Sequence, residues 1–439
     1  MARNTNINWR KKMIYQVFPR QYSAEANFEG VIKDLPRIKA LGTDILYLLP
    51  IHVIGKKDRK GNVGSPYSIY DYYSVNPEYG TLEDFKKLVN RAHEKEMLVM
   101  IDIVINHTSR DSVLTKNHPD WFYKKEDGTF ANRVGDWSDI TDLDFSNREV
   151  WDYLIDVLVY WAQIVDAFRC DVAPLVPIEF WEEAKQAVNK VNPNLFWVSE
   201  SVHPGFIKHI RDLGFDAHSD SEIYQVFDAL YDYDIDEYFR AYVENRGSLE
   251  KWLSEVERQE MIYPKNYIKL RHLENHDQNR IASYFDDCNK LINLTALNFF
   301  LRGMPFVYAG QEYLNDNRPD LFEYDPVDYE TGFNISPLIT RFAKIHEDEL
   351  ITSGNLFFLE IKDNPIIKYE NKTHAIIGFF KLGSESAVNS YLKDGVYQNL
   401  IDDSNIVVKD GKLELNSDPI IIKVGIEAIK WEHLLKSTT

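Results

Sequence analysis

The sequence predicts an α/β fold in which a parallel barrel of eight strands, a (β/α)8 TIM barrel, takes up most of the chain. Short apolar runs alternate with longer segments of helical period over about 300 residues. The runs are apolar on both faces, which is typical of parallel strands covered by helices. With 439 residues, the chain is long enough for a barrel of about 250 residues and smaller additional domains.

Seven apolar runs are predicted as barrel strands, and the segments between them as helices. In the first long segment after residue 81, Phe85, Leu88, Val89 and Ala92 fall on one helical face. An eighth strand, which a closed barrel needs, is expected in the weaker stretch 214–224. Periodicity alone also allows an open, doubly wound sheet. The seven runs are residues 14–18, 44–51, 98–106, 165–173, 195–201, 267–275 and 304–310.

Two parts of the chain break the alternation. Residues 108–146 are polar and rich in turn residues, and they are far longer than a usual βα loop of about two to six residues. After residue 347 the helical period disappears and short β-rich runs follow. We therefore expect a barrel of residues 1–107 and 147–347, a functional loop or inserted domain of residues 108–146, and an all-β domain of residues 348–439.

Composition excludes several classes of protein. Lys and Arg number 50 against 69 Asp and Glu, a net charge of −19, which disfavours nucleic acids and anionic membranes as partners. The two cysteines, Cys170 and Cys288, cannot form a disulfide framework or a thiolate metal site. The first residues lack the apolar segment of a secretory signal, and no apolar run approaches the ~18 residues of a membrane span. We expect a cytoplasmic protein.

Charged and polar residues stand at the C-terminal ends of four predicted strands, where a parallel barrel gathers its reactive groups. Each has a structural explanation on its own: Arg169 and Asp171, for example, share a strand face and could form a salt bridge. Carboxylates in apolar strands are costly to bury unless they are paired or functional, so their meeting at one rim favours an active site. The residues are Asp102, Asn106, His107, Arg169, Asp171, Glu200, His276 and Asp277.

These residues lie in stretches that resemble glycoside hydrolase family 13, the α-amylase family, over nearly the whole chain. The resemblance implies the barrel, an inserted B domain after strand three and a C-terminal antiparallel β-sandwich. The stretches are Asp102-Ile-Val-Ile-Asn-His107, Phe168-Arg-Cys-Asp171, Glu200 after an apolar strand, and Glu274-Asn-His-Asp277, supported by Ser65-Pro-Tyr67 and residues 303–312.

The resemblance implies that Asp171 is the nucleophile, Glu200 the general acid/base and Asp277 the third carboxylate. Cleavage of an acetal with retention needs one ionised carboxylate and one protonated carboxylic acid about 5–5.5 Å apart. Arg169 is expected to keep Asp171 ionised and oriented. Asp277 is expected to raise the pKa of Glu200 by like-charge repulsion.

The remaining predicted site residues bind sugar or metal. Tyr67 is expected to stack on the reacting glucose, and His107 and His276 to donate hydrogen bonds to its hydroxyl groups. Asp102 and Arg169 are also predicted to bind substrate. Asn106 and Asp142 match two oxygen ligands of the family's calcium, although calcium normally takes six to eight oxygens. No organic cofactor is expected, and the acidic run 232–237 is interpreted as a solvated face.

The predicted function is hydrolysis of α-1,4-glucosidic bonds in maltodextrins or malto-oligosaccharides, with the α-glucan as the only predicted partner. Val172 resembles the valine of oligo-1,6-glucosidases, so that activity, or transglycosylation with the same carboxylates, is the alternative. Pro174-Leu175 replace the Lys-His pair with which many α-amylases contact the leaving group. A non-catalytic binding homologue is a third hypothesis. The oligomeric state is not predicted.

Overall fold

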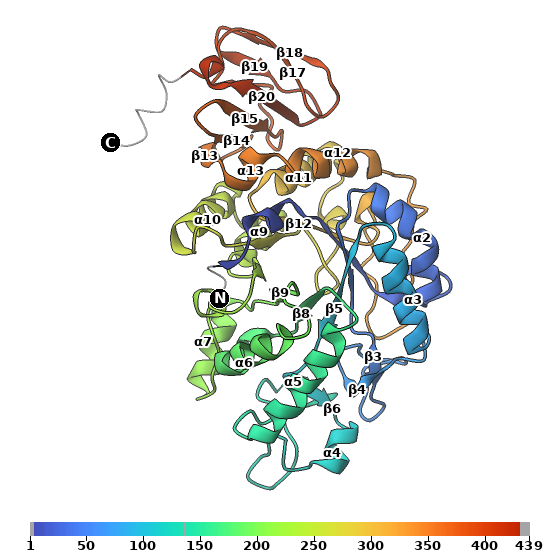
Figure 1. Ribbon diagram of the computed structural model, residues 1–439. Coiled ribbons are helices and arrows are strands. Elements are labelled where there is room, and N and C mark those ends of the chain that lie inside the picture. Colours follow the sequence, from blue (N-terminus) through green and yellow to red (C-terminus); the bar gives the residue numbers. More distant parts are fainter. Residues whose placement is uncertain (1–3, 136, 431–439) are drawn as a thin grey trace.

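The computed structural model describes residues 4–135 and 137–430. Eight parallel strands close into a barrel in the order β1-β12-β11-β10-β9-β8-β5-β2. The β-rich C-terminal part lies at one end of the molecule, and the segment after β5 lies at the opposite end (Figure 1). The barrel strands are β1 (Ile14–Val17), β2 (Ile45–Leu48), β5 (Leu98–Ile103), β8 (Ala167–Cys170), β9 (Phe196–Ser199), β10 (Ala229–Tyr231), β11 (Lys269–Arg271) and β12 (Met304–Tyr308).

Helices cover the outside of the barrel. In α3, Thr81 and Asp84 form a capping box, and the helix buries Phe85, Leu88, Val89 and Ala92, the face that the sequence predicts. The longer helices are α2 (Phe28–Ala40), α3 (Leu82–His93), α5 (Arg148–Ala162), α6 (Ile178–Val188), α7 (Pro204–Asp212), α9 (Asp236–Val243), α10 (Leu249–Ile262), α11 (Cys288–Phe300) and α12 (Ser336–His346). Short turns are α1 (Pro19–Tyr22), α8 (Asp220–Ile223), α13 (Glu349–Ser353), η2 (Ile7–Lys11), η3 (Ala173–Leu175), η4 (Ile281–Tyr284), η5 (Gln311–Tyr313) and η6 (Ile426–Ala428).

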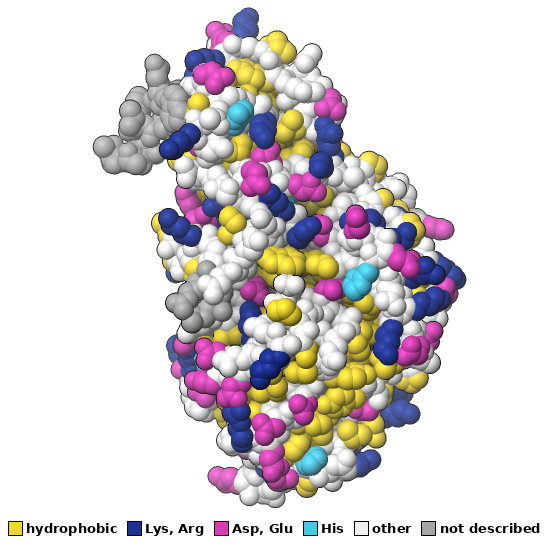
Figure 2. Space-filling model, viewed as in Figure 1, with side chains coloured by type: hydrophobic (Ala, Val, Ile, Leu, Met, Phe, Trp, Pro, Cys, Tyr) yellow, Lys and Arg dark blue, Asp and Glu magenta, His cyan; other side chains and the backbone are white. Residues whose placement is uncertain are grey.

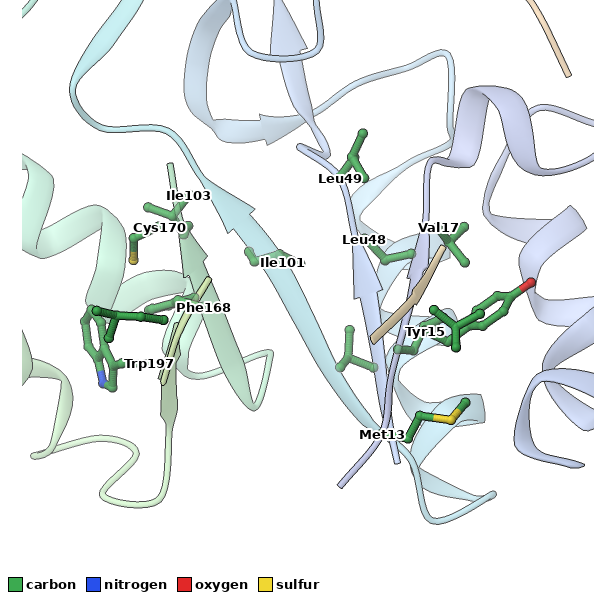
Figure 3. Packing of buried hydrophobic residues seen from close by; sticks show 14 of the residues in the cluster. Met13, Tyr15, Val17, Leu48, Leu49, Ile101, Ile103, Phe168, Cys170 and Trp197 are labelled. Atoms are coloured by element: carbon green, nitrogen blue, oxygen red, sulfur yellow. The ribbon is translucent and has the colours of Figure 1, made fainter. Parts of the chain in front are cut away.

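Side chains of each barrel strand alternate between two cores. Ile14 packs inside the barrel with Tyr47, Met100 and Phe306. Its neighbour Tyr15 belongs to the outer core, between the barrel and the helices. Figure 3 shows this outer core along four neighbouring strands and on β9, from Met13 and Val17 to Ile101, Phe168 and Trp197. Strands buried on both faces explain why the runs are continuously apolar.

All seven predicted strands are confirmed, but the position of the eighth is wrong. Residues 214–224 contain no strand; α8 begins there at Asp220, and its N-cap residue Ser219 forms a capping box with Glu222. The eighth strand is β10, which pairs Ala229 with Val198 and Leu230 with Lys269. β10 has only three residues and is followed by an acidic run, so the sequence shows no apolar periodicity there.

Two small sheets extend the barrel rim. After β2, β3 (His52–Ile54) and β4 (Ile69–Val75) form an antiparallel pair that the sequence analysis missed. After β5, β6 (His107–Ser109) and β7 (Ile140–Asp142) form another, with α4 (Val113–Asn117) between them. This second pair and the residues between its two strands form the insertion after the third barrel strand. The residue boundaries that we drew between the domains stay predictions.

The C-terminal part is an antiparallel β-sandwich, as expected. Apolar residues from both sheets, among them Ile377, Val408 and Leu413, form one core. One sheet has the order β13 (Asn355–Glu360), β14 (Ile366–Glu370), β15 (His374–Phe379), β20 (Ile420–Gly425), and the other β16 (Ala387–Asn389), β19 (Lys412–Glu414), β18 (Asn405–Lys409), β17 (Gly395–Gln398).

The surface carries charges of both signs. Figure 2 shows acidic and basic side chains interspersed on the visible face of the barrel and of the sandwich. Within residues 4–135 and 137–430, no helix has both the length and the apolar character needed to cross a membrane.

The acidic run after β10 is not a solvated face. Asp232 and Asp236 are buried, and Asp234 lies beside the fully buried Lys269 on β11. Lys269 Nζ lies 2.8 Å from Asp234 Oδ1 and also pairs with Asp220. Burial alone would lower the pKa of Lys269, but the two carboxylates raise it. The run is therefore part of a buried charge network that joins β10 and β11.

We expect replacement of Lys269 by methionine to lower the free energy of unfolding by about 3–5 kcal/mol, because it leaves two buried carboxylates without their cation. Urea unfolding followed by circular dichroism measures the change. Lys208, whose side chain is 75% exposed and pairs with Asp212, is the matched control. Lys208→Met should change stability by less than about 1 kcal/mol. Equal effects of the two substitutions would contradict the buried network.

Candidate active site

A pocket of about 290 Å³ opens at the C-terminal ends of the barrel strands. Five of the predicted site residues line it: Tyr67, His107, Asp171, Glu200 and Asp277. They come from the β3–β4 loop, the insertion, and the ends of β8, β9 and β11. The barrel therefore brings the three predicted catalytic carboxylates to one cavity.

Arg169 on β8 pairs with two of these carboxylates, Asp171 and Glu200, at the base of the pocket. Its Nη1 donates to Asp171 Oδ1 at 2.9 Å, and its Nη2 lies 2.6 Å from Glu200 Oε1. The same Nη1 donates to both oxygens of Asp102, at 2.8 and 3.0 Å. A rigid, planar guanidinium that pairs with Asp171 and Glu200 keeps them on one side of the cavity and close together.

Asp102 and Arg169, which we expected to bind substrate, are fully buried and do not line the pocket. Asp102 Oδ2 accepts hydrogen bonds from Tyr47 Oη at 2.6 Å and from Tyr67 Oη at 2.9 Å. Tyr67 also lines the pocket, so Asp102 positions one wall of it. Both charged residues act on the site through the side chains above them.

Burial and repulsion by neighbouring carboxylates raise the pKa of both Asp171 and Glu200, each of which is only 7% exposed. The pKa of Asp171 is raised well above its usual value by burial and by Glu200, against the opposing effect of Arg169. The pKa of Glu200 is raised by burial and by Asp277, again against Arg169. Burial and neighbouring negative charge thus both favour a protonated carboxyl group in this pair.

Asp277 is the exposed member of the three, with 44% of its side chain accessible. Partial desolvation of the Asp277 carboxyl group would raise its pKa, but the nearby His276 and Arg169 outweigh this effect and lower the pKa to about 2. His276 Nε2 lies 3.0 Å from Asp277 Oδ2 and 2.7 Å from Tyr67 Oη. Its Nδ1 contacts the Gln16 side chain at 2.8 Å. Asp277 is thus a fixed negative charge at the pocket entrance.

His107 and His276, the two histidines predicted to bind sugar hydroxyl groups, lie in different positions relative to the pocket. His107 lines the pocket, and burial lowers its pKa, so the neutral ring is the form present at neutral pH. His276 is buried behind Tyr67, with the two rings stacked at 5.5 Å between centroids. His276 therefore holds Tyr67 and Asp277 in place in addition to any contact with substrate.

Several pocket residues were not found by sequence reasoning. Lys60, Trp137, Asp139 and Phe322 line the pocket, and Trp137 packs against His107 with 5.6 Å between ring centroids. They lie in irregular loops, where periodicity carries no information. For Trp137 and Asp139, the unusual length of the 108–146 segment predicted a functional insertion, whereas Lys60 and Phe322 had no such signal.

Val172, directly after Asp171, has a left-handed backbone conformation with φ of 35°. β-branched residues rarely adopt this conformation. It directs the Val172 N–H to Glu200 Oε2, at 2.8 Å. The backbone after Asp171 thereby orients the carboxyl group of Glu200.

Asn106 and Asp142, the predicted calcium ligands, do lie together, but the guanidinium of Arg133 lies between them. Arg133 Nε donates to Asp142 Oδ2 and its Nη2 to Asn106 Oδ1, each at 2.8 Å. Asp142 Oδ1 has no hydrogen-bond partner among the described residues, yet it belongs to a carboxylate whose charge Arg133 balances. The described chain also has no cluster of three or more His, Cys, Asp or Glu with metal-binding geometry. These groups do not fit a calcium ion.

Comparisons with known proteins agree with this architecture. Residues 16–138 and 114–350 match the family model of the α-amylase catalytic domain, and residues 360–422 match the bacterial α-amylase C-terminal domain. An α-amylase from Lactobacillus plantarum is 46% identical, with a TM-score of 0.92 over 95% of this chain and 100% of that one. The maltogenic α-amylase AmyB from Thermotoga neapolitana is 32% identical, with a TM-score of 0.84 over the same shares.

Among curated relatives, a maltosyltransferase that uses maltose 1-phosphate and α-1,4-glucan, from Picrophilus torridus, is 27% identical over 85% of this chain and 61% of its own length. α-Amylase MalA from Haloarcula japonica is 25% identical over 85% of this chain and 55% of its own length. The chain thus spans less than two thirds of these relatives. The match to the catalytic-domain model over most of the chain, together with the closed barrel and its sandwich, shows that the chain belongs to the α-amylase family of glycoside hydrolases.

Proposed function

We propose that the chain hydrolyses α-1,4-glucosidic bonds of malto-oligosaccharides with retention of configuration. The observation that carries the proposal is the pairing of one buried guanidinium, Arg169, with both Asp171 and Glu200 at the floor of one pocket. Retaining glycosidases need two carboxyl groups close together, one as nucleophile and one as acid/base. A charged partner shared by both supports that arrangement.

In the first step, Glu200 donates its proton to the glycosidic oxygen while Asp171 attacks the anomeric carbon. The bond between that carbon and the oxygen breaks, the leaving sugar departs as an alcohol, and a glycosyl ester forms on Asp171. In the second step, ionised Glu200 takes a proton from water, which attacks the same carbon and releases Asp171. Two inversions give net retention.

The surrounding charges support these roles. As the reaction starts, the pair must hold its single proton on Glu200 and its negative charge on Asp171. Arg169 contacts both Asp171 Oδ1 and Glu200 Oε1 and so stabilises the negative charge of the pair. The negative charge of Asp277, at the entrance, favours the proton on Glu200 and stabilises positive charge that develops on the sugar ring.

Transfer to another acceptor is the second candidate. The first curated relative carries the name of a maltosyltransferase, and Pro174-Leu175 stand where many α-amylases have Lys-His. Chromatography of the first products from maltoheptaose, isomaltotriose, sucrose and maltose 1-phosphate distinguishes hydrolysis, α-1,6 preference and transfer. A non-catalytic role is disfavoured because all three carboxylates line the pocket. A cytoplasmic location stays a prediction from the sequence.

We further propose that Arg133, rather than calcium, joins the insertion to the barrel. Arg133 lies in the insertion, Asn106 follows β5, and Asp142 is on β7 with only 1% of its side chain exposed. A fixed guanidinium balances this buried carboxylate without a metal ion. No step of the reaction depends on this contact.

Replacement of the two catalytic carboxyl groups should separate their roles. We expect Asp171→Asn to abolish release of reducing sugar from maltoheptaose. Glu200→Gln should slow it by about 10²–10⁴-fold, the usual contribution of acid–base catalysis. With α-maltosyl fluoride, whose leaving group needs little protonation, Glu200→Gln should still form the glycosyl-enzyme, detected by mass spectrometry, whereas Asp171→Asn should not. An active Asp171→Asn enzyme that folds normally would refute the mechanism.

The Asp277→Asn variant should change the pH dependence. Because Asp277 raises the pKa of Glu200, its neutralisation lowers that pKa, and the acid loses its proton at lower pH. The alkaline limb of the kcat/KM profile should therefore shift to lower pH, while kcat/KM falls by about 100-fold or more. Asp216→Asn, a change of an exposed carboxylate outside the pocket, is the control. An unmoved alkaline limb in Asp277→Asn would contradict the assigned coupling.

Arg133→Met should lower the free energy of unfolding by about 3–5 kcal/mol, because Asp142 is left buried without its cation. Addition of EDTA should leave the Tm of the wild-type protein unchanged. The control is Arg110→Met, a change in the same insertion at a side chain that is 37% exposed. A clear drop of the wild-type Tm in EDTA, restored by calcium, would overturn the proposal.

A further inference from the structure

The loops on one side of the pocket are bonded to one another. Lys60 in the β3–β4 loop pairs with Asp139 of the insertion at 3.4 Å, and both line the pocket. Ser68 Oγ in the same loop donates to the Asp139 carbonyl oxygen at 3.0 Å. The β3–β4 loop and the insertion therefore form one continuous surface at this side of the cavity.

The β3–β4 loop is equally joined to the loop after β12. The Val63 N–H donates to the Phe322 carbonyl oxygen at 3.0 Å. Fully buried Arg20 donates through Nη1 to the carbonyl oxygens of Gly64, at 2.8 Å, and Leu321, at 3.1 Å. A buried guanidinium that ties the two loops together makes this side of the pocket a wall rather than a mobile lid. We call Lys60, Asp139, Leu321 and Phe322 the pocket wall.

The pocket wall lies across the barrel from the general acid. Its loops follow β2, β5 and β12, which with β1 make up one arc of the closed sheet. Glu200 follows β9, which is four strands from β1 in either direction. The acid gives its proton to the leaving-group oxygen, so the leaving sugar lies toward β9. The other end of the bound glucosyl unit points toward the wall.

We infer that the enzyme attacks chains from the non-reducing end and releases a short product, one or two glucosyl units long. This inference rests on the proposed hydrolysis. A chain cut in its middle must continue past both sides of the reacting bond, and the pocket wall blocks one of them. The cavity of about 290 Å³ is at the lower limit of the roughly 300–1,000 Å³ of small-molecule pockets, which suits a chain end. Phe322 and Lys60 offer an apolar ring and a hydrogen-bond donor to the terminal sugar.

The test compares two forms of 4-nitrophenyl maltoheptaoside, one free and one with a 4,6-O-ethylidene group on its non-reducing terminal glucose. Products are identified by chromatography after short incubation. The free substrate should release glucose or maltose first, and the blocked one should react about 100-fold more slowly. Equal cleavage of both would overturn the inference while the proposed hydrolysis stands. Cleavage of neither would instead refute the proposed hydrolysis.

Opening the pocket wall should remove the discrimination. In the double variant Lys60→Ala/Phe322→Ala, we expect the blocked substrate to react at least about 10-fold faster relative to the free one than in the wild type, with products of three or more units. The single variant Phe322→Ala, which keeps the ion pair of Lys60 with Asp139, should shift the ratio in the same direction. Lys57→Ala, in the same loop but exposed, is the control. An unchanged ratio in folded wall variants would show that the wall does not set the site of attack.

Discussion

The active site depends on one buried positive charge. Arg169 pairs with three carboxylates, Asp102, Asp171 and Glu200. They come from three neighbouring strands, β5, β8 and β9. A carboxylate moved from water into a protein core loses several kcal/mol of hydration, and three of them would also repel one another. The guanidinium makes this concentration of negative charge compatible with a folded barrel. It also holds the negative charge of these carboxylates at the pocket, where positive charge on a sugar ring would be stabilised.

The barrel adds a geometric constraint to this electrostatic one. Parallel strands end at a common rim, so residues that are far apart in the sequence meet there, as Tyr67 and His276 do across 209 positions. The rim loops then rest on a second buried guanidinium, Arg20, whose partners are main-chain carbonyl groups of two loops and Glu78. Charges buried on either side of the cavity thus fix its floor and its wall separately.

Much of the fold and of the candidate site could be predicted because both follow from local patterns. Strands buried on two faces give continuous apolar runs, and a carboxylate at the end of such a run stands out against its surroundings, as Asp171 and Glu200 do. β10 could not be located because it has only three residues and an acidic run follows it. The sequence suggests that this run is exposed, whereas in the structure it pairs with the buried Lys269. No local pattern reveals a partner 35 residues away. The roles of Lys60, Asp139 and Arg133 could not be predicted for the same reason, because their contacts join separate loops.

The left-handed backbone of Val172 connects the orientation of Glu200 to local packing at a single residue. Such a conformation costs about 1–3 kcal/mol and persists only where neighbouring packing enforces it. Here the neighbours are Leu175, Val202 and Ile207, which form a small apolar cluster with the Val172 side chain beside the pocket. A glycine at this position would relax the backbone but lose the cluster, whereas a larger apolar residue would keep the cluster and retain the strain. Any substitution at residue 172 therefore trades one free-energy cost for another, conformational strain of the main chain against loss of side-chain packing.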